Sequence, residues 1–304
     1  MRYIAGLDGG GTKTAGAVAD EKSNIIGKFT SGAINFNGQD EASIHGSVRE
    51  MMAKISDICG GLEHCAHICI GAAGVSNPSA CSRLAAMVRE CGYAGGLTIT
   101  GDHETAMYGS LESSSGIILI AGTGSICFGR NENGAEHRTG GGGHLIDDEG
   151  SGYSIGRDLI AASLKAHDDR IANRNIAPMV FARLKVKSVR ELIGFVYDPK
   201  TNKKDIAALA PLLSELCALG DEEAYAIARR SSLALYELVV PVAEKLALQD
   251  GEIALTGSVL TRNAVVRASL VALLGHKYPH LNCIAPKRDA AYGAALMALE
   301  KLQA

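Results

Sequence analysis

A strand, a glycine-rich turn and a second strand occur twice along this chain of 304 residues. The first copy, YIAGLDGGGTKTAGAVADEKSN, begins at Tyr3, and the second, GIILIAGTGSICFGRNENG, begins at Gly116. Short apolar runs bounded by Gly, Asn and Ser clusters are typical of strands joined by hairpin turns. Because the copies lie far enough apart to belong to separate domains, the sequence predicts an α/β protein with two lobes.

Apolar periodicity predicts the other elements of both lobes. We expect a first lobe at 1–110, with strands at 3–8, 13–20, 25–31, 67–74 and 97–101 and helices at 40–58, 78–91 and 103–112. We expect a second lobe at 111–288, mostly helical over 154–250 apart from an exposed loop at 198–205, with a strand, a Gly-Ser turn and a helix over 252–263. The stretch 286–302 predicts a helix with small residues on one face, and we expect 289–304 to pack back on the first lobe.

Composition excludes several classes of protein. The chain is 47% hydrophobic and 21% charged, which is typical of a globular domain, and no apolar run approaches the roughly 20 residues of a membrane span. The start, MRYIAGLD, enters a strand directly without the layout of a signal peptide, so we expect a cytoplasmic protein. A net charge of −3, no Trp and 5% aromatic residues argue against a nucleic-acid partner.

Cysteine spacing leaves a metal site as an alternative. The chain has 8 Cys, and the stretch CGGLEHCAHIC at 59–69 brings three of them close to two His residues. No C-x₂-C pair occurs there, and Cys69 falls in an apolar strand, so zinc is the weaker interpretation. Reduced thiols in a reducing compartment are the simpler one.

The first glycine turn, LDGGGTKT, predicts a phosphate-binding hairpin. Gly10 and Gly11 allow backbone N–H groups to point into one concavity, Thr12 adds a hydroxyl and Lys13 a positive charge. Asp8 can hold a hydrated Mg²⁺ that accompanies a nucleotide. An acidic β-turn with a solvated lysine is the alternative. The Walker and Rossmann spacings both fail here, and the turn leads into a strand, not a helix.

Two further turns and one acidic residue extend this pattern. The second turn places Gly122, Thr123, Gly124 and Ser125 after a strand, and the third places Gly257 and Ser258 at the start of a helix, where N–H groups suit an anion or a nucleoside sugar. Asp102 follows the strand LTITG. It could cap the next helix, or it could act as a base, because ligands of α/β sheets bind beyond the carboxyl ends of strands.

The order LDGGGTKT, TGDHETA, IAGTGS, LTGSV resembles the superfamily of actin, heat-shock ATPases and sugar kinases. Within it, the chain is more similar to the N-acetylglucosamine kinase and BadF/BadG-type ATPase family over nearly its whole length. GGGGHLIDDEGSGYSIG at 140–156 is similar to the family's G-G-W-G-H-x-x-G-D-E-G-S segment, and INFNG at 34–38 to its sugar-contacting segment. The resemblance implies an actin-like (ribonuclease H-like) α/β fold with ATP and sugar in a cleft between two lobes.

The resemblance also implies roles for residues and a reaction. Asp102 matches the base that takes the proton from the sugar 6-hydroxyl, and the three turns match the positions that hold the nucleotide. Sugar-contacting or site-ordering positions are implied at Asn35, Gly74, Asp102, Gly141, His144, Asp148 and Glu149. We therefore expect an ATP- and Mg²⁺-dependent kinase, a homodimer, acting on N-acetylglucosamine, N-acetylmuramate or both. Another hexose or glucosamine is the alternative substrate.

The chain departs from the family pattern at two positions of the sugar-binding segment. Gly142 stands where the family has Trp, and Asp147 where it has Gly. A smaller residue at 142 enlarges the pocket, whereas a carboxylate at 147 favours an amine or repels an acid. These two differences leave the identity of the amino sugar open.

Other functions fit parts of the sequence. GYSIG at 152–156 satisfies the G-x-S-x-G pattern of hydrolases, but a glycine-rich loop precedes Ser154 where that motif needs a strand. A BadF-type ATPase activator would need paired, exposed cysteines for an iron–sulfur cluster, whereas Cys127 and Cys217 fall in apolar stretches. A sugar-sensing regulator would carry a DNA-binding segment, which we do not expect before Tyr3.

Overall fold

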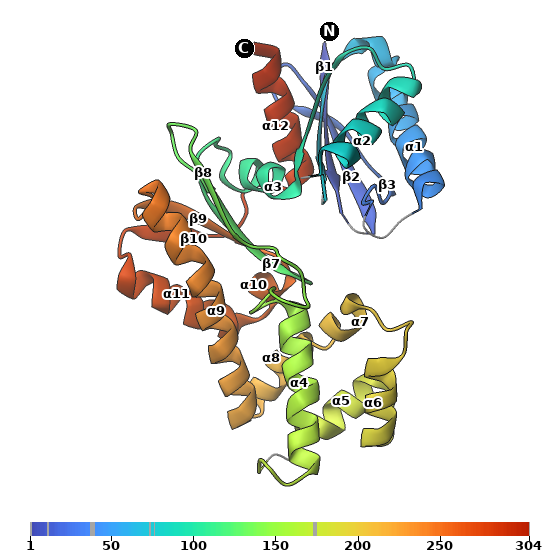
Figure 1. Cartoon of the computed structure of the whole chain (residues 1–304). Coiled ribbons are helices and arrows are strands. Elements are labelled where there is room, and N and C mark those ends of the chain that lie inside the picture. The colour runs from blue at the N-terminus through green and yellow to red at the C-terminus, as the bar shows by residue number, and fades with distance from the viewer. Residues whose placement is uncertain are drawn as a thin grey trace. The chain divides into compact units, whose positions relative to one another are not determined.

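The computed structural model describes residues 2–10, 12–36, 40–72, 74–75, 77–172 and 175–303. They divide into two units, one of Met1–Ser115 with Pro286–Ala304 and one of Gly116–Ala285 (Figure 1). The divisions fall within five residues of the lobe boundaries expected from the sequence. The C-terminal helix belongs to the first unit.

The first unit is built on a five-stranded mixed sheet of order β3-β2-β1-β4-β5. Its strands are β1 (Tyr3–Gly9), β2 (Lys13–Asp20), β3 (Ile25–Gly32), β4 (Cys65–Ala72) and β5 (Gly96–Gly101). β2 is antiparallel to β1 and β3, while β4 and β5 are parallel to β1. The carboxyl ends of β1, β3, β4 and β5 therefore meet at one edge of the sheet.

The second unit repeats this arrangement with different residues. Its sheet has the order β10-β9-β6-β7-β8, formed by β6 (Gly116–Ala121), β7 (Ser125–Arg130), β8 (Glu136–Gly140), β9 (Gly251–Thr256) and β10 (Leu281–Ile284). Here too the first three strands in the chain are antiparallel neighbours and the last two run parallel to the first. The repeat expected from the two hairpins therefore extends to whole sheets, which confirms the predicted α/β class.

Alternating side chains along β1 explain why its sheet is covered on both faces. Ala5 and Leu7 pack into the cluster that contains α1 (Glu41–Cys59) and α2 (Pro78–Glu90). Ile4, one residue out of phase, packs into the small cluster with α12 (Ala290–Gln303). Period-two alternation on a strand with two apolar faces thus fixes the register of a three-layered unit.

Close backbone contacts hold α12 in the first unit. A Cβ atom on Gly6 of β1 would lie 2.1 Å from the backbone nitrogen of Ala295, and one on Gly293 would lie 2.1 Å from the carbonyl oxygen of Thr105 in α3 (Asp102–Leu111). Glycine at these two positions lets β1 and α3 approach the helix more closely than any other residue would allow. The small-residue face predicted for this helix is the face that packs.

The helices of the second unit follow the sequence prediction with some differences. They are α4 (Gly152–His167), α5 (Ile176–Leu184), α6 (Val189–Tyr197), α7 (Lys203–Ala207), α8 (Pro211–Ala218), α9 (Glu222–Leu246), α10 (Ser258–Arg262) and α11 (Ala264–Lys277). The predicted end of the loop at 198–205 is wrong. The loop is shorter, because Asn202 and Asp205 form a capping box and α7 begins at Lys203. No described helix is both long and apolar enough to cross a bilayer.

Candidate active site

Four predicted residues of the first unit lie at the carboxyl edge of its sheet. Asp8 is near the end of β1, Asn35 follows β3, Gly74 follows β4 and Asp102 follows β5. The register places Asp8 beside Gly71 of β4, which in turn pairs with Thr100 of β5. The topology thus gathers residues that are up to 94 positions apart in sequence (102 minus 8) at one edge.

Asp102 is the first residue of α3 and does not cap it. The N-cap is Gly101, whose conformation is extended, and no side chain caps the helix. The interpretation of Asp102 as a helix cap is therefore wrong. Its carboxylate is 45% exposed and lies 3.7 Å from Nδ1 of His103, measured at Oδ1. The carboxylate is left facing solvent at the strand end, where a substrate hydroxyl could reach it.

Asp8 lies in the most acidic part of this edge. The pKa of Asp8 is raised to about 6, chiefly by burial and additionally by the negative charges of Asp102 and Asp289. Asp289 is itself paired with Lys28, whose Nζ lies 2.7 Å from Oδ2. Two neighbouring carboxylates without a cation between them repel each other, so this edge would be stabilised by a bound cation.

The first glycine turn uses one of its own N–H groups. Gly10 donates a hydrogen bond to the carbonyl oxygen of Lys13 at 3.0 Å, which closes the hairpin between β1 and β2. This N–H group does not point into an anion site, contrary to the expectation for Gly10. Thr12 and Lys13 are exposed, and Gly11 lies outside the described residues.

The second and third turns adjoin each other at the edge of the second sheet. Ile120 of β6 pairs with Thr256 of β9, so the turn after β6 lies beside Gly257. Gly257 has a φ of +89°, and a Cβ atom there would lie 2.3 Å from the carbonyl oxygen of Ala121. Only glycine fits this position. The helix that follows, α10, is five residues long and begins at Ser258 of the predicted Gly-Ser turn.

The second turn leaves two N–H groups without a protein acceptor. Gly122 donates to the carbonyl oxygen of Gly124 at 2.9 Å, and Ser125 is buried, with its N–H 3.0 Å from Oδ1 of Asp148. In the described part of the chain, the N–H groups of Thr123 and Gly124 donate to no protein atom. These two N–H groups, and not those of Gly122 or Ser125, are therefore available to an anionic ligand.

The acidic end of the glycine-rich segment braces this turn. Ser125 donates twice to this segment: its N–H donates to Asp148, and its hydroxyl donates to the carbonyl oxygen of Glu149 at 2.7 Å. The first N–H groups of α4, those of Gly152 and Tyr153, donate to the carbonyl oxygens of Gly122 and Thr123 at 2.7 and 3.2 Å. Asp148 is buried with a φ of +63°, so it orders the turn and does not face solvent.

The two departures from the family pattern contact each other. The N–H of Gly142 donates to Oδ2 of Asp147 at 2.7 Å, and a Cβ atom at 142 would lie 2.8 Å from the same oxygen. A glycine at 142 is therefore what makes room for the carboxylate at 147.

The rest of the glycine-rich segment is more exposed. Gly141 donates to the carbonyl oxygen of Ser125 at 2.9 Å, which ties the segment to β7. His144 is partly exposed and lies edge-on to Tyr153, with ring centroids 4.7 Å apart, so it is not a buried histidine of the core. Glu149 keeps 55% of its side chain exposed and lies 3.2 Å from the Arg157 guanidinium.

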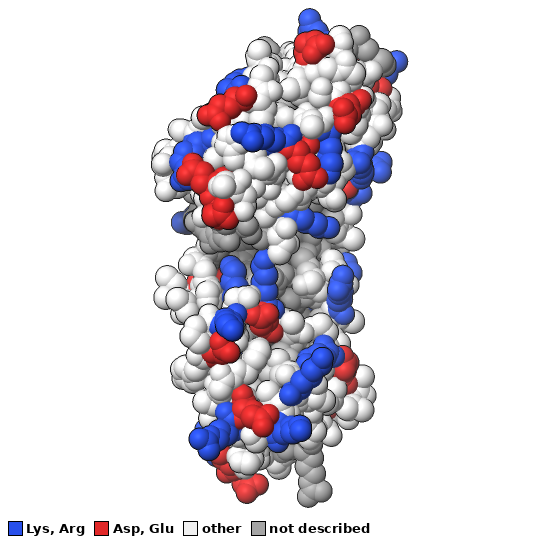
Figure 2. All heavy atoms as spheres, turned by 90° about the vertical axis from the view of Figure 1, so that its right-hand side faces the viewer, with Lys and Arg blue, Asp and Glu red and all other residues white. Residues whose placement is uncertain are grey.

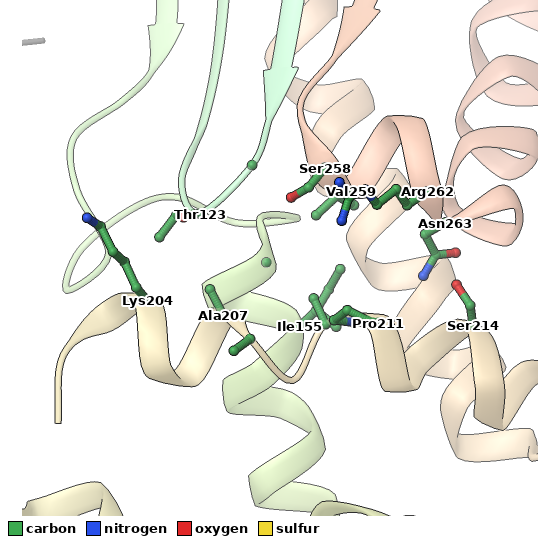
Figure 3. Close-up of a pocket in the computed structure, with 14 residues that line it drawn as sticks. Thr123, Ile155, Lys204, Ala207, Pro211, Ser214, Ser258, Val259, Arg262 and Asn263 are labelled. Carbon is green, nitrogen blue, oxygen red and sulfur yellow. The ribbon is translucent and has the colours of Figure 1, made fainter. Parts of the chain in front are cut away.

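A cavity of about 330 Å³ opens beside the second turn (Figure 3). Thr123 of the second turn and Ser258 of the third turn both line this cavity. Its other walls come from α4, α7, α8 and the start of α11. The lining residues are Gly122, Thr123, Gly152, Ile155, Lys204, Ala207, Ala208, Ala210, Pro211, Ser214, Ser258, Val259, Arg262 and Asn263. Volume and mixed apolar and polar lining are those of a small-molecule site.

Sequence reasoning missed the cavity wall formed by 204–214 and Asn263. One signal was available in GYSIG, whose glycines have packing roles. A Cβ atom on Gly156 would lie 2.1 Å from the carbonyl oxygen of Ile206, and one on Gly152 would lie 2.9 Å from that of Gly122. Two glycines four residues apart at the start of a helix thus indicated that another backbone approaches it.

The rival sites have less support in the structure. Ser154 lies in the first turn of α4, is 5% exposed and donates to Glu149 at 3.0 Å, so it lacks the strand-borne position of a hydrolase nucleophile. Cys127 and Cys217 are buried. Among the described residues, no three His, Cys, Asp or Glu side chains form a cluster that could hold a metal.

Figure 2 shows one face of the molecule, on which basic and acidic side chains are interspersed.

A comparison with protein families places this site in a known context. The model of the BadF/BadG/BcrA/BcrD ATPase family matches residues 5–298, which include all three turns, Asp8, Asp102 and the cavity. The chain belongs to this ATPase family. The resemblance drawn from the four motifs is thereby confirmed.

Individual relatives are named as amino-sugar kinases. The chain is 34% identical over 301 residues to the N-acetylmuramic acid/N-acetylglucosamine kinase of Clostridium acetobutylicum, covering 98% of each chain. It is 30% identical over 308 residues to the N-acetyl-D-glucosamine kinase of Dictyostelium discoideum, covering 97% of each. The fold also occurs in a ROK family glucokinase from Streptomyces griseus, solved with glucose and AMPPNP, at 18% identity, a TM-score of 0.60 and coverage of 98% and 99%.

Proposed function

We propose that this chain is an ATP-dependent kinase that transfers the γ-phosphoryl group to the 6-hydroxyl of an amino sugar, N-acetylglucosamine or N-acetylmuramate. The observation that best supports nucleotide binding is the cavity beside the second turn, at 122–125. The free N–H groups of Thr123 and Gly124 suit phosphate oxygens, and the cavity beyond them suits a nucleoside. Names of full-length relatives at 30–34% identity support the same reaction.

The first unit supplies the acceptor side of the reaction in this proposal. Phosphoryl transfer needs positioned reactants and neutralised charge more than covalent chemistry from the protein. Asp102, with its exposed carboxylate at the end of β5, accepts the proton of the sugar hydroxyl, a contribution typically worth about 10²–10⁴-fold. Asn35 and Gly74, at the same sheet edge, contact the sugar.

Magnesium fits the donor set around Asp8. Carboxylate oxygens are hard ligands, and Mg²⁺ is usually held by one or two of them together with water and substrate phosphates. Burial and the nearby carboxylates of Asp102 and Asp289 raise the pKa of Asp8, and a bound cation would favour its ionised form. When bound, the ion would neutralise the polyphosphate, with Asp8 holding it through water. Thr12 and Lys13 contact the phosphates from the first turn.

The braced turn and the sugar segment complete the proposed roles. Asp148 and Ser125 order the second turn, while Gly141, His144 and Glu149 lie in the exposed segment next to it and contact the sugar. We also propose that the protein is a homodimer. Light scattering at several protein concentrations would measure its molecular mass.

The proposed role of Mg²⁺ has its own test. EDTA is expected to abolish turnover, and added Mg²⁺ is expected to restore it.

The experiment is an assay of ADP release with Mg-ATP and a panel of sugars. The panel contains N-acetylglucosamine, N-acetylmuramate, glucosamine, N-acetylmannosamine and glucose, and ³¹P NMR identifies the phosphorylated position. We expect ADP release that depends on an N-acetylated amino sugar and yields its 6-phosphate. ADP release that ignores every sugar would favour an ATPase without an acceptor, the main alternative within this family.

A further inference from the structure

We propose that Asn263 recognises the base of the bound nucleotide, with its amide nitrogen Nδ2 donating a hydrogen bond to a ring nitrogen of a purine. This inference rests on the proposed nucleotide site and adds the group that selects the base. Asn263 lies between α10 and α11, is 5% exposed and lines the cavity.

The orientation of the Asn263 amide is fixed by the helix that follows it. Its Oδ1 accepts a hydrogen bond from the backbone N–H of Val266 at 3.1 Å and thereby caps α11. A backbone N–H can only donate, so the atom that faces Val266 must be the oxygen. The NH₂ group is therefore directed away from the helix.

The NH₂ group has no partner within the protein. Nδ2 of Asn263 is buried and is the one fully buried side-chain polar atom in the described residues that makes no hydrogen bond. Buried polar groups are nearly always hydrogen-bonded, and an exception calls for an explanation. A ligand acceptor in the cavity that Asn263 lines provides one.

The position of Asn263 within the cavity matches the base of a nucleotide. In Figure 3 Asn263 and Ser214 lie at one end of the labelled residues, and Thr123 of the second turn lies with Lys204 towards the other. Between them, Ile155 and Pro211 offer apolar surface for a planar ring. With phosphates at Thr123, the base reaches the end where the unpartnered donor lies.

The fixed amide determines what kind of atom it can bind. Since Oδ1 is occupied by the helix, Asn263 presents donors only, and it requires an acceptor on the ligand. Adenine offers acceptors at the ring nitrogens N1, N3 and N7. Replacing whichever nitrogen is bound by a C–H group removes the hydrogen bond while leaving the shape of the base unchanged.

The test compares binding of ATP with binding of 1-deaza-, 3-deaza- and 7-deaza-ATP by calorimetry, with wild type and with Asn263→Asp. Aspartate keeps the cap of α11 but replaces the donor by an acceptor. We expect Asn263→Asp to weaken ATP binding roughly five- to fiftyfold, the range expected when a buried donor–acceptor pair is lost. One of the deaza analogues should bind wild type more weakly than ATP does, by the same factor. The affinity of that analogue for Asn263→Asp should be no lower than its affinity for wild type.

A matched control separates this effect from the substitution itself. The Oδ1 atom of Asn131 also accepts backbone N–H groups, those of Asn133 and Ala135, and it lies in the hairpin at the far end of β7 from the second turn. Asn131→Asp should bind ATP like wild type. Thermal unfolding of all three proteins shows whether Asn263→Asp remains folded, and the analogue series on wild type needs no variant.

Two results would overturn the inference. One is that all three analogues bind wild type as tightly as ATP does. The other is that Asn263→Asp loses affinity equally for every analogue, which would make the residue a support of α11 alone. Failure of the proposed function looks different, because wild type would then bind no ATP at all or would bind it without phosphorylating any sugar.

Discussion

The carboxylate of Asp148 accepts a hydrogen bond from the backbone N–H of Ser125 at 3.0 Å, inside the second unit. A residue expected at the sugar is thus buried against the turn expected at the phosphates. Through this bond, the segment proposed to contact the sugar also sets the geometry of the turn proposed to bind the nucleotide.

Replacing Asp148 should damage both stability and nucleotide binding. Asp148→Ala leaves the buried Ser125 N–H without an acceptor, which costs about 1–3 kcal/mol, and it keeps an unfavourable positive φ. We expect a lower melting temperature and a nucleotide KM raised at least about tenfold. Asp148→Asn keeps an acceptor oxygen and should recover most of both, measured by calorimetry and steady-state kinetics. Equal KM values in wild type and Asp148→Ala would contradict a bracing role.

Gly257 gives a test of the contact between the second and third turns. Gly257→Ala places a Cβ atom 2.3 Å from the Ala121 carbonyl at a φ of +89°, so we expect a loss of about 3 kcal/mol or more in the free energy of unfolding. Gly275→Ala in α11 is the control, because a Cβ atom there meets nothing within 4 Å and helix propensity predicts a gain of about 0.5–1 kcal/mol. Urea denaturation measures both, and a stable Gly257→Ala protein would show that the turns can separate.

The raised pKa of Asp8 predicts opposite effects of pH on stability and on activity. Because the pKa is raised from 3.8 to about 6, the free protein becomes less stable as the pH rises through that window and the carboxyl ionises. Asp8→Asn should therefore be more stable than wild type above pH 6, by up to about 3 kcal/mol, with no difference below pH 4. Melting curves across pH test this, and a constant difference at every pH would contradict it.

Activity should follow the charged form of the same group. Only ionised Asp8 holds the cation in the proposed mechanism, so kcat/KM for Mg-ATP should fall as the pH drops below about 6. The free-enzyme pKa governs kcat/KM, so the profile reports the group before the nucleotide binds. A profile that is flat between pH 5 and 8 would remove Asp8 from the proposed site.

Ser154 separates the kinase from the hydrolase interpretation. Ser154→Ala removes a hydroxyl that donates to Glu149 at the start of α4, and we expect sugar kinase activity within about threefold of wild type. An ester substrate should be hydrolysed by neither protein. Loss of all activity in the variant would revive a nucleophilic serine.

Strong periodicity and glycine chemistry explain what the sequence could predict. The hairpins after Tyr3 and Gly116 combine long apolar runs with turns, and β1, β2, β6 and β7 lie where these patterns indicate. The missed strands are both at sheet edges: β8, EHRTG, is polar, and β10, LNCI, has four residues. Edge strands are short and polar because one side is unpaired, so they lack the pattern that identifies a strand.

The sequence could indicate candidate residues that follow strand ends, but not the cavity wall, which is built by packing between helices. Glycines after an apolar run identify a turn at the end of a strand. Asp8 and Asp102 were recognised because they lie next to such strand ends. The cavity wall comes from Ala207, Pro211 and Ser214, which no motif joins to the turns and which α4 brings near them. The sequence also could not predict that Asp148 accepts the hydrogen bond from the Ser125 N–H, because the two residues are 23 positions apart in the chain.

The central claim is that Asp102 is the base of a sugar kinase, and one measurement tests it most directly. Wild type, Asp102→Asn and the surface control Asp57→Asn are compared for sugar-dependent ADP release, with Mg-ATP and each sugar of the panel. We expect Asp102→Asn to lower kcat by about 10²–10⁴-fold while the KM for ATP changes little and Asp57→Asn behaves like wild type. Sugar-dependent ADP release at an undiminished rate in Asp102→Asn would contradict this role.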